Sequence, residues 1–481
     1  MSYVGSLACL LLALADPPTG RVTAPAAPSA LDVVSALESV MTEAIAKAEP
    51  SVVAIARVKS ESGTTTAVKG RTRPQPPLDF DVVTEADMGA DAVALDIGSG
   101  VVIGTHGEIL TAFHVVQGAE RIHARATDKQ RFEAEIIAAD PRSDLAVIVP
   151  KLFPGSRPPK LTPLTIGDAS TLRKGTFLIA LGNSYNAAAQ DGDASASWGI
   201  LSNVARRLEL NEDQARETKE LNLSNYPTLL QLDSKLNLGM SGGAVVNLKG
   251  ELVGITSNNA NAVGFDPHAG YAIPMDTIGR RAVEALREGK EVEYGFLGIT
   301  LDRQSYSNLV MGANVGTPAA EGKLLVKDAI LAVGDIPVHD LDTLVLAINS
   351  HGPGSTPVLT IKRGDKTIQR TVQLNKVRVL GEVIATNRPS PWRGMLVDYT
   401  SALPIVNSES LVLAISKGSL AVMSVEPNSP AARAGLKEGQ IIVGVEGQRI
   451  RTPQEFAEII KDKKDSVRLE TDEGPRMITA N

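Results

Sequence analysis

A serine lies on a glycine-rich segment near the middle of the chain, in the sequence Leu238-Gly239-Met240-Ser241-Gly242-Gly243. Glycines on both sides of a serine let the backbone turn sharply, so that the hydroxyl is presented and nearby N–H groups can converge on one point. This is the form of a serine nucleophile beside an oxyanion hole, to which Gly239 and Ser241 would contribute their N–H groups. The pattern alone is weak, because loops rich in glycine and serine are common.

A histidine and an aspartate precede this serine along the sequence. His114 follows the mostly apolar residues 109–113, and Asp144 comes directly before the apolar residues 145–148. Histidine can accept the serine proton near neutral pH, and a carboxylate can fix the imidazole tautomer and stabilise the imidazolium. The order His, Asp, Ser is that of the double β-barrel serine proteases, not of the α/β-hydrolases or subtilisins. Each residue alone could be structural, but together they predict a catalytic triad.

The stretch from about residue 97 to 300 resembles the HtrA/Deg family of serine endopeptidases. The resemblance rests on short segments spread over this stretch: 98–103, 107–111, 178–183, 198–202, 231–233, 254–257 and 270–274. It implies a protease domain in which Ser241 is the nucleophile, His114 the general base and Asp144 the orienting carboxylate. It implies no cofactor, and it suggests a homotrimer or a larger assembly of trimers.

Two C-terminal segments repeat each other over roughly ninety residues, which is a plausible size for a domain. In each, an apolar and glycine-containing segment is followed by Pro-Ala-Ala, an apolar strand and a helix. The repeats resemble tandem PDZ domains, which add an extended peptide or the C-terminus of a protein to a sheet edge. The resemblance assigns peptide binding to Phe296, Leu297, Gly298 and Ile299 in the first repeat and to Gly394, Met395, Leu396 and Val397 in the second. The alternative for either repeat is a blocked groove that serves as a spacer.

The serine segment departs from the family pattern at three positions. Met240 stands where the family has Asn, and Lys235 and Leu238 replace the usual residues of the same loop. Since the oxyanion donors are backbone groups, Met240 need not abolish activity, although the methionine could alter the resting loop. We expect Lys235 to point into solvent rather than into the specificity pocket. The departures leave open a non-proteolytic PDZ scaffold or holdase, and a narrow regulatory protease is a third alternative.

Residues 4–15 form an apolar run that ends in Ala-Leu-Ala, which fits a signal-peptide core and its cleavage site. No Lys or Arg precedes the run, and it is too short to be a transmembrane helix. Cys9, the single cysteine, lies inside the run, so cleavage would leave a protein without disulfides or thiol chemistry. We therefore expect an exported protein of the periplasm or cell envelope.

The expected fold is mainly β: a double six-stranded antiparallel β-barrel of the chymotrypsin type, followed by two small α+β PDZ domains. A helix is expected from Ala30 to Ala48, because its apolar residues recur at spacings of three and four. Residues 59–95 and 205–227 are expected to be exposed loops, and residues 98–100 a barrel turn. The expected domains are a signal peptide at 1–15, a disordered linker at 16–30, a protease domain at 31–290, and PDZ domains at 291–378 and 385–481.

The composition of the 481-residue sequence narrows the function further. A hydrophobic content of 43% supports packed cores, and the net charge of −7 argues against a general nucleic-acid binder. Neither a metal-spaced His/Glu cluster nor a phosphate-binding glycine loop occurs in the sequence. We therefore expect an ATP-independent serine endopeptidase that cuts unfolded or damaged proteins in envelope quality control.

Overall fold

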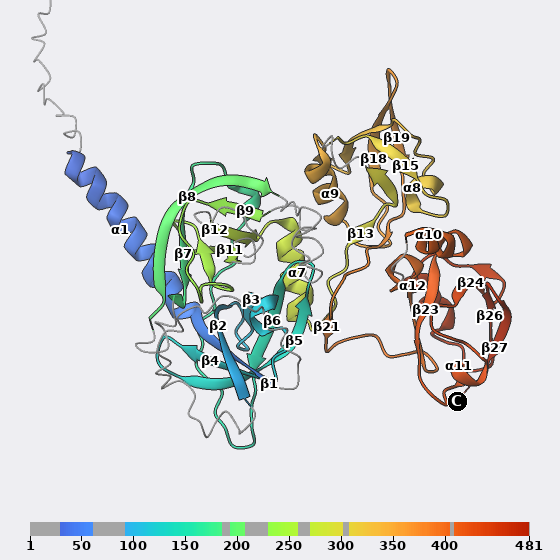
Figure 1. The fold of residues 1–481 in the computed structure, drawn as a ribbon, viewed down its shortest axis with the longest axis horizontal. Coiled ribbons are helices and arrows are strands. Elements are labelled where there is room, and N and C mark those ends of the chain that lie inside the picture. Colours follow the sequence, from blue (N-terminus) through green and yellow to red (C-terminus); the bar gives the residue numbers. More distant parts are fainter. Residues whose placement is uncertain are drawn as a thin grey trace, which may run out of the picture.

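The structure is a computed structural model, and it describes residues 29–60, 92–184, 193–206, 229–257, 270–301, 307–404 and 408–480. Two β-barrels occupy the first half of the molecule, and two smaller units built of strands and helices follow them (Figure 1). The expected signal peptide and nearly all of the expected linker lie outside the described residues. So do most residues of the two expected loops. None of the described helices is long and apolar enough to cross a bilayer.

The first barrel contains six antiparallel strands and closes through the pairing of β5 with β6. Its strands are β1 (Val52–Ser60), β2 (Ala92–Val102), β3 (Ile109–Ala112), β4 (Arg121–Ala126), β5 (Arg131–Asp140) and β6 (Leu145–Pro150). The prediction of a turn at residues 98–100 is wrong, because these residues lie within β2 and pair with β1. Glycine is required there by packing: a Cβ on Gly98 would lie 2.5 Å from the Val115 side chain, and one on Gly100 would lie 2.6 Å from the Ile109 side chain.

The second barrel is also closed and six-stranded. Its strands are β7 (Phe177–Gly182), β8 (Ser195–Arg206), β9 (Leu229–Leu232), β10 (Ala244–Val246), β11 (Leu252–Thr256) and β12 (Gly270–Pro274). The predicted N-terminal helix is confirmed as α1 (Ala30–Ala48), which is capped by the Ser29 side chain and leads into β1. A longer helix than α3 (Phe113–Val116) is α7 (Thr277–Arg287), which leaves the barrel after the cap residue Asp276.

The two C-terminal units share most of their order of elements and have separate apolar cores. The first contains β13 (Gly295–Phe296), β14 (Ile299–Leu301), β15 (Val310–Ala313), α8 (Pro318–Glu321), β16 (Ala329–Val333), β17 (Ile336–Pro337), α9 (Leu341–Asn349), β18 (Val358–Arg363), β19 (Lys366–Thr371) and β20 (Asn375–Lys376). The second contains β22 (Met395–Tyr399), β23 (Leu420–Val425), α11 (Pro430–Arg433), β24 (Ile441–Val445), β25 (Gln448–Arg449), α12 (Pro453–Ile460), β26 (Val467–Thr471) and β27 (Gly474–Ile478). It differs by an additional helix, α10 (Ser408–Lys417), between its first two strands.

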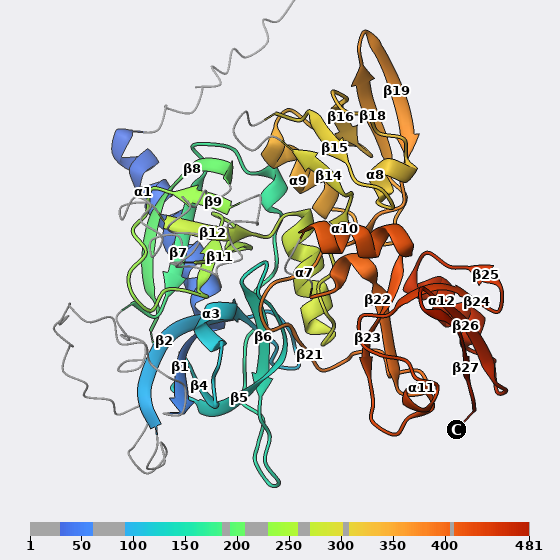
Figure 2. The same ribbon diagram turned by 45° about the vertical axis from the view of Figure 1, so that its right-hand side comes forward.

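The segment between the two C-terminal units returns to the first barrel (Figure 2). Its short strand β21 (Ile384–Ala385) pairs antiparallel with β5, and the Thr386 hydroxyl donates a hydrogen bond to the Ile137 carbonyl at 2.9 Å. The connection therefore adds a seventh strand to the first sheet, which the sequence pattern did not indicate.

A buried lysine joins the two C-terminal units to the segment that leaves the barrels. Lys376 is 4% exposed, and its ammonium lies 3.0 Å from Glu291, 3.1 Å from Glu293 and 2.7 Å from Asp398. The Lys376 carbonyl also accepts a hydrogen bond from the Ser401 hydroxyl at 2.7 Å. Burial alone would lower the pKa of Lys376, but the three carboxylates outweigh it and raise the pKa above its ordinary value. This lysine cluster holds the second unit against the first.

Candidate active site

The first two members of the predicted triad are in direct contact. His114 lies on α3 (Phe113–Val116), the single helical turn that follows β3, and Asp144 lies directly before β6. The His114 Nδ1 atom is 2.7 Å from Asp144 Oδ2, and the His114 backbone N–H donates to Asp144 Oδ1 at 2.9 Å. The Asp144 side chain is almost fully buried, while the His114 ring is 23% exposed. The carboxylate can therefore orient an imidazole that still reaches the surface.

The backbone around Asp144 holds its carboxylate in place. Asp144 has φ of +56°, an uncommon conformation for a residue with a side chain. Its carbonyl accepts a hydrogen bond from the Phe113 N–H at 2.8 Å, which ties the turn to the start of α3. From the second barrel, the Ser257 hydroxyl donates to Asp144 Oδ2 at 3.0 Å. Ser257 is thus a functional candidate that the triad pattern did not identify.

The serine turn is built around glycines that cannot be replaced by larger residues. Gly239 and Gly242 have φ of +89° and +83°, the left-handed region in which glycine has no steric penalty. A Cβ on Gly239 would lie 2.2 Å from the Asn183 carbonyl oxygen, and one on Gly242 would lie 2.2 Å from the Ser99 carbonyl oxygen. A Cβ on Gly243 would lie 2.3 Å from a carbonyl of β7. The backbone therefore adopts the sharp turn that the sequence predicts.

The serine turn packs against the segment that carries His114. The Ser241 carbonyl accepts a hydrogen bond from the Ser99 N–H at 2.8 Å. A Cβ added to Gly98 would touch both the Val115 side chain and, at 3.2 Å, the Ser241 carbonyl oxygen. The structure thus brings the three sequence-predicted residues to the junction of the two barrels.

Ser99 bridges the two barrels beneath this junction. Its hydroxyl donates to the Gly239 carbonyl at 2.7 Å and accepts from the Asn183 N–H at 2.7 Å. Its own carbonyl accepts a hydrogen bond from the Thr111 hydroxyl at 2.6 Å. A buried serine in β2 therefore positions the glycine turn, a role that is visible only when the two barrels are assembled.

The three departures from the family pattern lie in different surroundings. Met240 is 1% exposed, and its sulfur lies 3.4 Å from the Asn237 backbone nitrogen. Its own N–H donates to the Asn237 carbonyl at 3.1 Å, and its carbonyl accepts from the Gly243 N–H at 2.9 Å. Met240 therefore fills space inside the protein beneath the turn. Lys235 is exposed, as predicted, and Leu238 is 60% exposed.

The glycines of the two predicted peptide-binding loops occupy equivalent places in their units. A Cβ on Gly298 would lie 2.3 Å from the Thr317 Cβ, and one on Gly394 would lie 2.1 Å from the Ser429 Cβ. Thr317 and Ser429 cap the helices of the two Pro-Ala-Ala elements. Since Gly298 corresponds to Gly394, the residues equivalent to Phe296 and Leu297 in the second unit are Trp392 and Arg393. The two sets assigned from the sequence are therefore offset by two positions.

The second unit has a groove along its strand β22. A cavity of about 280 Å³ lies between Met395, Leu396 and Val397 on one side and the apolar face of α12 on the other. Trp392 lines it as well, and so do Pro389 and Ser390 from the connecting segment. This is the strand-and-helix groove in which an extended peptide could add to β22.

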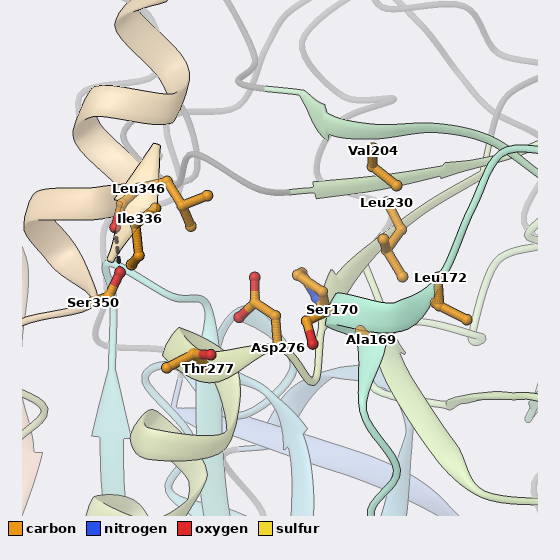
Figure 3. Close-up of a pocket in the computed structure, with 11 residues that line it drawn as sticks. Ala169, Ser170, Leu172, Val204, Leu230, Asp276, Thr277, Ile336, Leu346 and Ser350 are labelled. Atoms are coloured by element: carbon orange, nitrogen blue, oxygen red, sulfur yellow. Dashed lines mark hydrogen bonds between the residues drawn. The ribbon is translucent and has the colours of Figure 1, made fainter. Parts of the chain in front are cut away.

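Another cavity, of about 310 Å³, lies between the second barrel and the first C-terminal unit (Figure 3). Leu346 and Ile336 of that unit face Ser170 and Asp276 of the barrel side across it. None of the sequence-predicted site residues lines this cavity. It is therefore separate from the junction that holds the candidate triad.

The chain is similar to known proteins over most of its length. The family described as Trypsin-like peptidase domain matches residues 98–255, and two families described as PDZ domain match residues 295–374 and 422–472. A "Probable periplasmic serine endoprotease DegP-like" of Chlamydia trachomatis is 30% identical over 379 residues, which cover 76% of this chain and 70% of the relative.

Other relatives carry similar descriptions. The "Periplasmic serine endoprotease DegP" of Salmonella typhimurium is 28% identical over 394 residues, covering 79% of this chain and 75% of the relative. The "Periplasmic pH-dependent serine endoprotease DegQ" of Escherichia coli is 28% identical over 395 residues, covering 79% of both proteins. A solved structure titled "HtrA-type protease AlgW with tripeptide" is 23% identical, covers 73% of this chain and 98% of its own, and has a TM-score of 0.49.

Proposed function

The chain belongs to the family of DegP-like serine endoproteases, and on this premise we propose that Ser241, His114 and Asp144 are its catalytic triad. The observation that carries the proposal is the contact of 2.7 Å between His114 Nδ1 and Asp144 Oδ2. That contact leaves the other ring nitrogen, Nε2, to act on the serine hydroxyl. The protein is a serine endopeptidase with a trypsin-like domain and two PDZ domains.

The reaction follows from these roles. His114 accepts the Ser241 proton as the serine oxygen attacks the scissile carbonyl, and the buried Asp144 stabilises the imidazolium that forms. His114 then donates the proton to the leaving amine, which breaks the peptide bond and leaves an acyl group on Ser241. Water, activated by His114, hydrolyses the acyl-enzyme and restores the serine. Ser257 supports the Asp144 carboxylate through its hydrogen bond of 3.0 Å.

We assign the oxyanion hole to the N–H groups of Gly239 and Ser241. A donor of this kind contributes about 2.7–4 kcal/mol to transition-state stabilisation. Because the donors are backbone groups, a methionine at position 240 is compatible with catalysis.

We further propose that the substrates are unfolded or damaged proteins, cut without ATP in quality control of the cell envelope. The PDZ domains would bind extended peptides or C-termini of these substrates, with Gly298 and Gly394 in the carboxylate-binding loops. The relatives are described as periplasmic, which supports export of this protein. The proposed domains are 31–290 for the protease and 291–378 and 385–481 for the PDZ domains, and the proposed assembly is a homotrimer or a larger assembly of trimers.

The proposal can be tested by degradation of unfolded β-casein. The wild-type protein is compared with Ser241→Ala and with Ser195→Ala, a matched serine substitution on β8 outside the proposed triad. We expect the wild type and Ser195→Ala to degrade casein at similar rates and Ser241→Ala to be inactive. Equal, negligible degradation by all three proteins would favour the scaffold or holdase alternative.

A further inference from the structure

A second aspartate organises the turn that carries Asp144. Asp140, the last residue of β5, is 1% exposed and accepts hydrogen bonds from the backbone N–H groups of Arg142 and Ser143 at 3.3 and 3.0 Å. These two amides belong to the same turn as Asp144, whose φ of +56° has to be held by its surroundings. The position of the Asp144 carboxylate therefore depends on the Asp140 side chain.

Asp140 in turn contacts a tyrosine that follows the protease domain in the sequence. The Tyr294 hydroxyl donates a hydrogen bond of 2.5 Å to Asp140 Oδ2, and the tyrosine is 1% exposed. Two guanidinium groups lie near its ring, Arg142 of the turn at 5.0 Å and Arg281 of α7 at 5.8 Å from the ring centre. Burial raises the pKa of Asp140, and the tyrosine hydroxyl and the turn amides partly offset that effect. Loss of the Tyr294 hydroxyl would leave the buried Asp140 carboxyl group with one hydrogen bond fewer.

Tyr294 lies at the start of the first PDZ domain. It immediately precedes β13, and the peptide-binding loop proposed above begins two residues later, at Phe296. The Arg281 side chain, on α7, holds the backbone next to Tyr294. It donates hydrogen bonds to the Glu293 carbonyl at 2.8 Å and to the Asn349 carbonyl of α9 at 2.6 Å. The tyrosine thus connects the PDZ domain to the turn of the proposed catalytic aspartate through its hydrogen bond with the Asp140 side chain.

We propose that Tyr294 is a positioning residue for catalysis, which acts through Asp140 to hold the turn of Asp144. The inference rests on the proposed function of the triad. The hydroxyl is the group that matters, because the phenyl ring can keep its packing between the two arginines without it. Removal of the hydroxyl therefore affects the alignment of Asp144 with His114 rather than substrate binding.

The test compares the full-length protein with Tyr294→Phe and a matched control, Tyr399→Phe. Tyr399 is equally buried, lies in the second PDZ domain, and its hydroxyl has no hydrogen-bond partner among the described residues. Active sites are titrated with a fluorophosphonate, and kcat per titrated site and KM are measured on an internally quenched peptide. Normalisation by titrated sites removes the effect of any misfolded fraction, so a merely structural role would not change kcat.

We expect Tyr294→Phe to lower kcat per site about tenfold, which corresponds to about 1.4 kcal/mol, with KM unchanged. Tyr399→Phe should match the wild type. A wild-type kcat in Tyr294→Phe would overturn this inference alone, as would a change in KM without a change in kcat. A wild-type protein that neither cleaves the peptide nor reacts at Ser241 would overturn the proposed function and, with it, this inference.

Discussion

Replacement of Lys376 by methionine should weaken the attachment of the second PDZ domain. Methionine has a similar length but no charge, so Glu291, Glu293 and Asp398 would remain close together without their shared cation. Removal of one partner from a buried ion pair costs about 3–5 kcal/mol. These carboxylates are 20–40% exposed, so solvent relieves part of that cost. We therefore expect the lower end of the range, about 3 kcal/mol.

The assay is urea denaturation followed by the fluorescence of Trp392. The protein has two tryptophans, so a Trp198→Phe background leaves Trp392 as the sole reporter, inside the second PDZ domain. With a denaturant slope of about 1–3 kcal/mol per molar urea, a loss of 3 kcal/mol lowers the midpoint by about 1–3 M. The matched control is Lys417→Met, which removes an exposed ion pair with Asp472 and should cost less than about 1 kcal/mol.

The effect of Lys376 should have a defined pH dependence. Its pKa in the folded protein is raised, so its contribution to stability is present at every pH below the ordinary lysine pKa. That contribution is lost progressively as the pH rises from the ordinary lysine pKa to the raised one. The difference in unfolding free energy between wild type and Lys376→Met should therefore be constant from about pH 6 to 9.

Equal urea midpoints for Lys376→Met and Lys417→Met would refute the proposed contribution of Lys376 to stability.

Three further substitutions test the site and the groove. Gly239→Ala should abolish proteolysis in the casein assay, because the new Cβ would lie 2.2 Å from a carbonyl oxygen. The control Gly435→Ala, at a similar φ but with open space around it, should retain activity, and equal activity of the two variants would contradict the proposed turn. Ser257→Ala should lower kcat by about ten- to 150-fold, since hydrogen bonds to charged groups contribute about 1.5–3 kcal/mol. An unchanged kcat would exclude a role for this hydroxyl. Ala457→Trp should fill the groove of about 280 Å³ and abolish binding of C-terminal peptides to the second PDZ domain in calorimetric titrations, and undiminished binding would place the peptide elsewhere.

Local patterns were sufficient to predict the elements that carry the site. The helix from Ala30 to Ala48 follows from apolar spacing, and the contact between His114 and Asp144 follows from residue types and their order. The glycines around Ser241 predicted a sharp turn because few other residues adopt a positive φ without strain. These features are encoded within a few residues each.

Features that depend on the assembled barrels could not be predicted in the same way. Ser257 contacts Asp144, which is 113 positions away in the sequence. No local sequence pattern indicates that a serine hydroxyl has such a distant partner. The glycines at 98 and 100 suggested a turn, but they are required by side chains packed against the strand from other elements. The pairing of β21 with β5 depends on two residues, too few for a periodic signal.

The most direct test of the triad is fluorophosphonate labelling of the full-length protein, with the modified peptide identified by mass spectrometry. The reagent reacts with a serine only where a base and an oxyanion hole are assembled around it. We predict labelling at Ser241 in the wild type, none in Ser241→Ala, and strongly slowed labelling in His114→Ala. Absence of labelling in the wild type, or labelling that persists in Ser241→Ala, would contradict the proposed active site.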